Sequence, residues 1–124
     1  MTTFSVPVQI GDLAATHFET IEAVVDRGST FTAVPGDILR RLGIQPARRQ
    51  SFRLASGDVV ESDVGDARVR VAGLEGVTPV IFNGPGEPNL LGAVTLEALV
   101  LGVDQVAQRL IPVEGLRVSR LDPR

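Results

Sequence analysis

Asp26 stands at the end of an apolar alternating segment, residues 21–25, and begins the run Asp26-Arg27-Gly28-Ser29-Thr30. A carboxylate at such a strand-to-turn step has two interpretations. It can cap the turn through a backbone hydrogen bond, or it can be a functional acid or base held in a fixed place. A second Asp-x-Gly, at residues 63–65, lacks both the preceding apolar strand and a following Ser or Thr, so the short motif alone does not decide between them.

Other catalytic chemistries lack the residues that they need. The 124-residue chain has no Cys and one His, His17, which excludes a disulfide framework and a thiolate zinc site. Cys-His or Ser-His catalysis within one subunit is disfavoured as well. His17 is more typical of a surface loop than of a catalytic group. We therefore expect no bound metal and no organic cofactor.

Charge argues against nucleic acid as a partner. The formal net charge is −3 with a pI near 5.1, and all 12 basic residues are Arg, which is the opposite of a basic nucleic-acid footprint. The pairs at 40–41 and 48–49 are interpreted as solvated charges. No segment reaches transmembrane length and the N-terminus lacks the pattern of a signal peptide. We expect a cytoplasmic protein that does not bind membranes.

Turn residues divide the chain into short elements of one domain, residues 1–124, with a polar tail from about 115 to 124. Alternating apolar residues predict strands at 4–10, 21–25, 31–35, 77–82 and 109–113. Residues 50–60 predict a hairpin that turns at Ala55-Ser56-Gly57-Asp58. Helical spacing predicts short helices at 38–42, before Gly43, and at 94–99 after Leu90-Leu91-Gly92. The apolar residues occupy even-numbered positions before Gly65-Asp66 and odd-numbered positions after it, which predicts a bulge or bend there.

The order of these segments resembles the retropepsin-like aspartic proteases, the single-domain bacterial relatives of retroviral proteases. The resemblance runs from about residue 21 to 113 and covers the Asp26 run, Leu42-Gly43-Ile44, the turn at 54–58 and Leu90-Leu91-Gly92-Ala93. It implies a mainly β fold with one or two short helices, as a closed or partly open barrel-like lobe. It also implies an endopeptidase acting on an extended peptide or protein substrate.

Such enzymes use two carboxylates that share one proton, one acting as base on the attacking water and the other polarising the peptide carbonyl. This chain has one such motif and the length of one lobe, so the resemblance implies a homodimer with Asp26 from each subunit. Gly28 would allow the two loops to approach, and Ser29 or Thr30 could hydrogen-bond the carboxylate. The resemblance places Asp26, Gly28 and Ser29 in the catalytic loop, and it implies substrate binding by Thr30 and by the flap residues Ala55, Ser56, Gly57 and Asp58.

Arg27 departs from the family pattern, which has Thr or Ser between the Asp and the Gly. That hydroxyl bonds across the dimer in the family, whereas a guanidinium favours two ionised carboxylates and repels its own copy. Three interpretations stay open: Arg27 turns outward, the protein is a natural pseudoenzyme, or a single base change has replaced a Thr. The alternative function is therefore an inactive dimer that binds a peptide or partner, and a third is a β-rich interaction module without a cleft function.

Overall fold

A computed structural model of the chain describes residues 3–120. These residues contain nine strands and two short helices. In chain order the elements are β1 (Ser5–Gly11), β2 (Phe18–Val25), β3 (Thr32–Pro35), α1 (Gly36–Arg41), β4 (Arg48–Arg53), β5 (Val59–Val71), β6 (Leu74–Asn83), β7 (Leu90–Leu91), α2 (Ala93–Ala98), β8 (Leu101–Asp104) and β9 (Arg109–Pro112).

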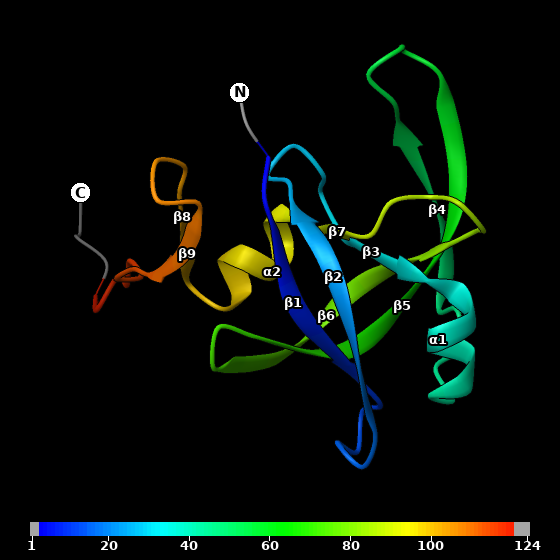
Figure 1. The fold of residues 1–124 in the computed structure, drawn as a ribbon, viewed down its shortest axis with the longest axis horizontal. Coiled ribbons are helices and arrows are strands. Elements are labelled where there is room, and N and C mark those ends of the chain that lie inside the picture. Colours follow the sequence, from blue (N-terminus) through cyan, green and yellow to red (C-terminus); the bar gives the residue numbers. More distant parts are fainter. Residues whose placement is uncertain (1–2, 121–124) are drawn as a thin grey trace.

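Seven of these strands form one sheet that closes on itself. Its order is β1-β2-β7-β3-β6-β5-β4, and β1 also pairs with β5 through residues such as Ile10 and Val69. This last pairing joins the first strand to the long β5 and gives the ring seen in Figure 1. The predicted fold class, mainly β with two short helices in a barrel-like lobe, is confirmed.

Alternation along the strands places one apolar face inside the ring. Val8 and Ile10 of β1 and Val69 of β5 are buried, while their neighbours in the strands are more exposed. Leu39 of α1 and Leu96 of α2 pack on the same core. This period of two is what a half-buried strand requires, because successive side chains point to opposite faces of the sheet.

The bulge predicted at Gly65-Asp66 is not present in the pairing of β5 with β6, which runs one to one from Val64 opposite Ile81 to Val71 opposite Leu74. Both faces of β5 are covered near Gly65, where the apolar residues switch from even-numbered to odd-numbered positions. Val64 is fully buried, and a Cβ at Gly65 would lie 2.8 Å from the carbonyl oxygen of Gln45. The change of inward face thus marks a strand buried on both sides.

Both predicted helices are present, each within one or two residues of its expected bounds, and Gly43 follows α1 with a positive φ of 77°. The predicted terminal strand is β9, but its partner is β8, and the two form a separate hairpin. Residues 113–120 contain neither helix nor strand, and 121–124 of the expected tail lie outside the described residues. Between residues 3 and 120, no helix is long and apolar enough to cross a membrane.

Candidate active site

Asp26 directly follows the last residue of β2, and a neighbouring strand fixes its backbone. The parallel pairing of Val25 with Leu91 of β7 carries the chain to this point. The Asp26 N–H donates to the carbonyl oxygen of Leu91 at 3.0 Å, and Oδ1 accepts the N–H of Gly28 at 2.9 Å. The side chain is half-buried. The turn therefore holds the carboxylate in a defined orientation while leaving it accessible.

The start of α2 holds the rest of the Asp26 loop, defined as residues 26–31. The N–H of Ala93 donates to the Ser29 carbonyl oxygen at 2.8 Å, and that of Val94 donates to the Thr30 carbonyl oxygen at 3.0 Å. These bonds satisfy N–H groups of the first helical turn, which have no partner inside the helix. The late Leu-Leu-Gly-Ala segment and the Asp26 loop, more than 60 residues apart in sequence, thus form one unit.

The hydroxyls of the loop do not hold the carboxylate as the sequence suggested. The Ser29 Oγ donates to the Phe31 carbonyl oxygen at 2.8 Å, so it stabilises the loop itself. Within residues 3–120, Thr30 makes no side-chain hydrogen bond, and it is exposed toward the cavity described below. The expected side-chain bond from Ser29 or Thr30 to the Asp26 carboxylate is not present, and the Gly28 N–H donates to that carboxylate instead.

Three buried threonines lie behind the loop, and the sequence analysis missed them. Thr95 Oγ1 lies 2.6 Å from Thr32 Oγ1 and 3.0 Å from Thr78 Oγ1, and Thr32 Oγ1 accepts the N–H of Gly92 at 3.1 Å. All three side chains are at most 1% exposed. The network links β3, β6 and α2, so it positions the two segments that hold Asp26. The available signal was a Thr at the inward position of each of these elements.

A cavity of about 500 Å³ lies between the Asp26 loop and the β4–β5 hairpin. Its floor is a row of side chains across the sheet, in which Leu90 pairs with Ala33 and Ala33 with Ile81. The loop contributes Gly28, Ser29 and Thr30, and the hairpin contributes Ser51, Phe52, Arg53, Leu54, Val60 and Ser62. The cavity is therefore an apolar groove beside the carboxylate, with the hairpin as its opposite wall.

The tip of the β4–β5 hairpin extends away from the rest of the sheet, as Figure 1 shows in green. Ala55, Ser56, Gly57 and Asp58, which the sequence analysis expected to bind substrate, are exposed and do not line the cavity of this subunit. Gly57 has a φ of 94°, as the turn requires. The N–H of Leu54 donates to the Asp58 carbonyl oxygen at 2.8 Å. The structure therefore places Gly28, Ser29 and Thr30 at the groove and the four tip residues beyond it.

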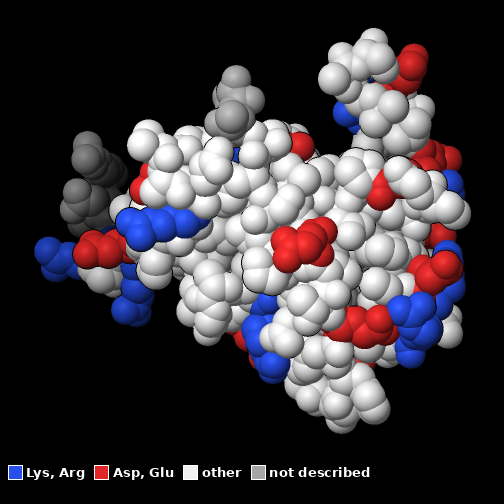
Figure 2. Space-filling view, viewed as in Figure 1, with Lys and Arg blue, Asp and Glu red and all other residues white. Residues whose placement is uncertain are grey.

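Arg27 is exposed next to the carboxylate, and within residues 3–120 it forms no ion pair. Acidic and basic side chains lie close together over α1 and β4, at the right of Figure 2. One pair there is Arg49 with Asp63 at 2.9 Å. Arg27 differs from Arg49 in having no such carboxylate partner among the described residues.

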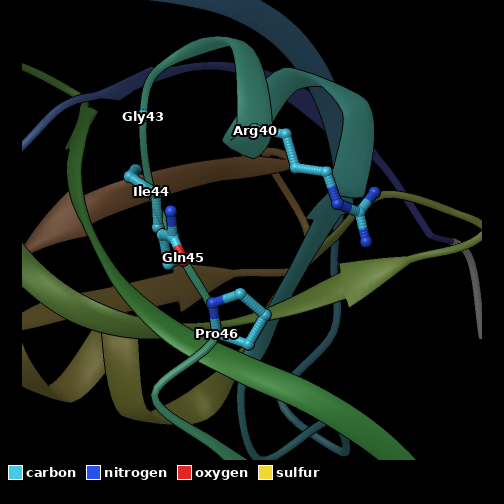
Figure 3. Close-up of a pocket in the computed structure, with 5 residues that line it drawn as sticks. All are labelled: Arg40, Gly43, Ile44, Gln45 and Pro46. Atoms are coloured by element: carbon cyan, nitrogen blue, oxygen red, sulfur yellow. The ribbon is translucent and has the colours of Figure 1, made fainter.

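A second hollow, of about 340 Å³, lies after α1 and is lined by Arg40, Gly43, Ile44, Gln45 and Pro46. In Figure 3 the Arg40 side chain points away from Ile44 and Gln45. Its guanidinium lies 5.5 Å from the centre of the Phe82 ring. This hollow groups no acid or nucleophile, and among the described residues no three His, Asp or Glu side chains could hold a metal ion.

Comparisons with known proteins agree with the fold. The family model described as aspartyl protease matches residues 6–95. The solution structure of the simian foamy virus (mac) protease is similar, with a TM-score of 0.51 and 21% identity, over 76% of this chain and 94% of that one. No curated protein sequence matches the chain.

The family match spans well over half of the chain and includes the Asp26 loop, the hairpin and Gly92. The chain belongs to the aspartyl protease family, and its fold is that of the retroviral proteases.

Proposed function

We propose that this protein is an aspartic-type endopeptidase that works as a homodimer, with one Asp26 carboxylate from each copy of a single-domain chain. The observation that carries the proposal is the position of Asp26, half-buried beside an apolar groove and held by Leu91 and Gly28. The family match supports protease chemistry of this kind. Neither a metal nor an organic cofactor enters the mechanism.

The reaction needs two carboxylates with one proton between them. The ionised carboxylate takes a proton from a water, whose oxygen attacks the peptide carbonyl carbon. The protonated carboxyl donates to the carbonyl oxygen, so that the tetrahedral intermediate forms without a separated negative charge. The carboxyl that took the water proton then donates it to the amide nitrogen, while the other carboxylate takes the proton of one hydroxyl of the diol. The C–N bond breaks, the new carboxylic acid and amine leave, and the pair again holds one shared proton. Two like charges held this close disfavour double ionisation, which keeps the proton in place.

The second carboxylate comes from another copy of the chain in this proposal. A two-fold axis beside Asp26 generates an isologous interface and brings the same loop from both subunits together. Gly28 suits this position because it is exposed and has no side chain. The Asp26 loop, the hairpin tip and the β8–β9 turn extend toward the same side of the molecule in Figure 1. A second copy could therefore meet all three at one surface.

The proposal is tested by cleavage of unfolded casein across acidic to neutral pH, with and without pepstatin. We expect cleavage that pepstatin stops and that Asp26→Asn abolishes. Asp66→Asn is the matched control, because Asp66 is an exposed carboxylate of β5 with no ion pair among the described residues. Persistent cleavage by Asp26→Asn, or none by the native protein, would overturn the assignment.

Mixing subunits tests the shared site directly. When Asp26→Asn is mixed in equal amount with native chain at fixed total concentration, random pairing leaves about a quarter of the dimers with both carboxylates. We expect about a quarter of the native activity. A site complete in one subunit would leave about half, which would exclude the paired mechanism.

Arg27 favours a second candidate, an inactive dimer that binds a peptide or partner in the groove. Its charge lies beside Asp26 without a carboxylate partner in the described part of its own subunit. In a dimer with its axis beside Asp26, the two copies of this charge would repel each other. This candidate predicts peptide binding without cleavage by the native protein.

A further inference from the structure

Six of the nine arginines in residues 3–112 form ion pairs with Asp or Glu, and the three that do not are Arg27, Arg48 and Arg53. Arg53 lines the groove, and the other two belong to the segments that form its walls. Arg27 precedes Gly28 in the Asp26 loop, while Arg48 and Arg53 begin and end β4. Within residues 3–112 of a chain with net charge −3, the arginines without an ion pair thus lie near this one site. Arg117 and Arg120, in the segment after β9, also form no ion pair with a described residue.

Arg53 lines the groove with part of its hydrogen-bonding capacity free. One nitrogen donates to the Gly57 carbonyl oxygen at 2.8 Å, which fixes the side chain along the hairpin. A guanidinium has five N–H donors in a planar fork, and the Arg53 side chain makes no other hydrogen bond within residues 3–120. The remaining donors suit a carboxylate, which accepts two parallel N–H bonds from such a fork.

Arg48 lies on the face of the sheet that forms the groove floor. In the register of the sheet, Arg48 of β4 lies opposite Val64 of β5, and Val64 lies opposite Ile81 of β6. Ile81 lies opposite Ala33 of β3. Residues directly opposite one another in neighbouring strands point to the same face. The Arg48 guanidinium carbon lies 5.8 Å from the centre of the Phe31 ring. Phe31 in turn packs edge to face on Phe52 of the groove, with the ring centres 5.8 Å apart. The aromatic ring orients this cation at the end of the floor.

The acidic side chains do not neutralise these two cations. Glu87 is the only acidic residue lining the cavity, and its Oε1 accepts the N–H of Gly84 at 2.7 Å. Arg48 and Arg53 lie five residues apart in an extended strand, which separates their backbones by about 16 Å. Between them the groove offers apolar contacts from Phe52, Ile81 and Leu90. The complementary ligand has an apolar centre and negative charge toward its ends.

We propose that the groove selects acidic peptides, extended segments in which Asp or Glu flanks an apolar residue, and that Arg48 and Arg53 are the residues that determine this preference. The inference rests on the proposed function, since it specifies the substrate of that same groove. Attraction between these charges also makes the preference weaken as salt concentration rises.

The test uses one apolar peptide flanked by Glu, and the same peptide flanked by Gln or by Lys. We expect kcat/KM to be about three- to tenfold higher for the Glu-flanked peptide than for the Gln-flanked peptide, and lowest for the Lys-flanked peptide. A difference of this size is what partly exposed ion pairs contribute. The ratio of kcat/KM for the Glu-flanked peptide to kcat/KM for the Gln-flanked peptide should fall toward one in Arg48→Gln and in Arg53→Gln. Arg49→Gln is the matched control on the same strand, because Arg49 pairs with Asp63, and its ratio should remain that of the native protein.

Binding separates failure of this inference from failure of the proposed function. The labelled peptides are titrated into Asp26→Asn and their fluorescence anisotropy is followed, which needs no cleavage. If no peptide is cleaved but the Glu peptide still binds about three- to tenfold tighter than the Gln peptide, the endopeptidase assignment is wrong and the acidic preference stands. Equal binding and equal cleavage of all three peptides would refute the preference alone.

Discussion

Gly92 lies directly against the backbone of Phe31. A Cβ at Gly92 would stand 2.5 Å from both the carbonyl carbon and the carbonyl oxygen of Phe31, and 2.8 Å from the N of Thr32. No real Cβ atom approaches backbone this closely, so only glycine allows β7 and α2 to pack on the Asp26 loop.

Gly92→Ala should therefore destabilise the protein and displace the Asp26 loop. Relieving a clash with backbone atoms requires movement of the loop, and overpacking of this kind costs about 1–3 kcal/mol. Urea unfolding measures the loss of stability. Gly115→Ala is the control, since its Cβ would meet only Val100 at an ordinary 3.7 Å. Equal stability of the two variants would show that the close approach is not needed.

Thr95→Val should weaken the threonine network while preserving shape. The change removes the hydroxyl that Thr32 and Thr78 share and leaves buried polar groups without that partner, at about 1–3 kcal/mol for each unsatisfied group. Thr95→Ser retains the hydroxyl and should cost about 1 kcal/mol for the lost methyl. A double-mutant cycle with Thr32→Val isolates the coupling. Strict additivity would mean that the two hydroxyls do not act together.

Arg27→Thr should tighten the dimer and raise proteolysis. The substitution removes two like charges from the proposed axis and supplies hydroxyls that can bond across it, each worth about 1 kcal/mol. Sedimentation across a concentration series measures the dimer, and casein cleavage measures activity. Adding Asp26→Ala to Arg27→Thr should abolish cleavage but keep the tighter dimer. Unchanged association and cleavage in Arg27→Thr would indicate that Arg27 points away from the axis or that the site is not catalytic.

Acid should destabilise the fold through its carboxylate–arginine pairs. Hydrogen bonds from Arg70 and then Arg68 lower the pKa of Glu75 below its usual 4.5, and a hydrogen bond from Arg41 lowers the pKa of Glu19. A carboxyl whose folded pKa is depressed stabilises the protein above its unfolded pKa and loses that contribution as the pH falls through its folded pKa. The urea midpoint should therefore decline below about pH 4.5.

Glu75→Gln isolates one of these contributions. Because Gln does not titrate, the variant should be less stable than the native protein at pH 7 and should lose less on going to acid. Glu61→Gln, at an exposed site without an ion pair in residues 3–120, should follow the native pH profile. If Glu75→Gln lost stability with acid as steeply as the native protein, the pair would not contribute to acid unfolding.

The sequence determined both helices, the hairpin and most of the strands, but not β8, because the elements that it determined each have a local signal. Alternation marks β1 and β2, Gly43 ends α1, and the Ala55–Asp58 turn carries the residues of a tight turn. The order of these elements, together with one Asp-x-Gly-Ser-Thr run, was enough to indicate the aspartic protease family. Local signals of this kind depend only on neighbours in the chain.

Tertiary structure alone decided what surrounds Asp26. The hydrogen bond from Gly28, the support from Leu91 and α2, and the meeting of Thr32, Thr78 and Thr95 join residues up to 65 positions apart. The Ser29 hydroxyl donates to the Phe31 carbonyl oxygen rather than to the Asp26 carboxylate. The parity change at Gly65 also had a nonlocal cause, since burial of both faces of β5 depends on the segment around Gln45. Periodicity cannot show which distant groups will meet, because closure of the ring determines those contacts.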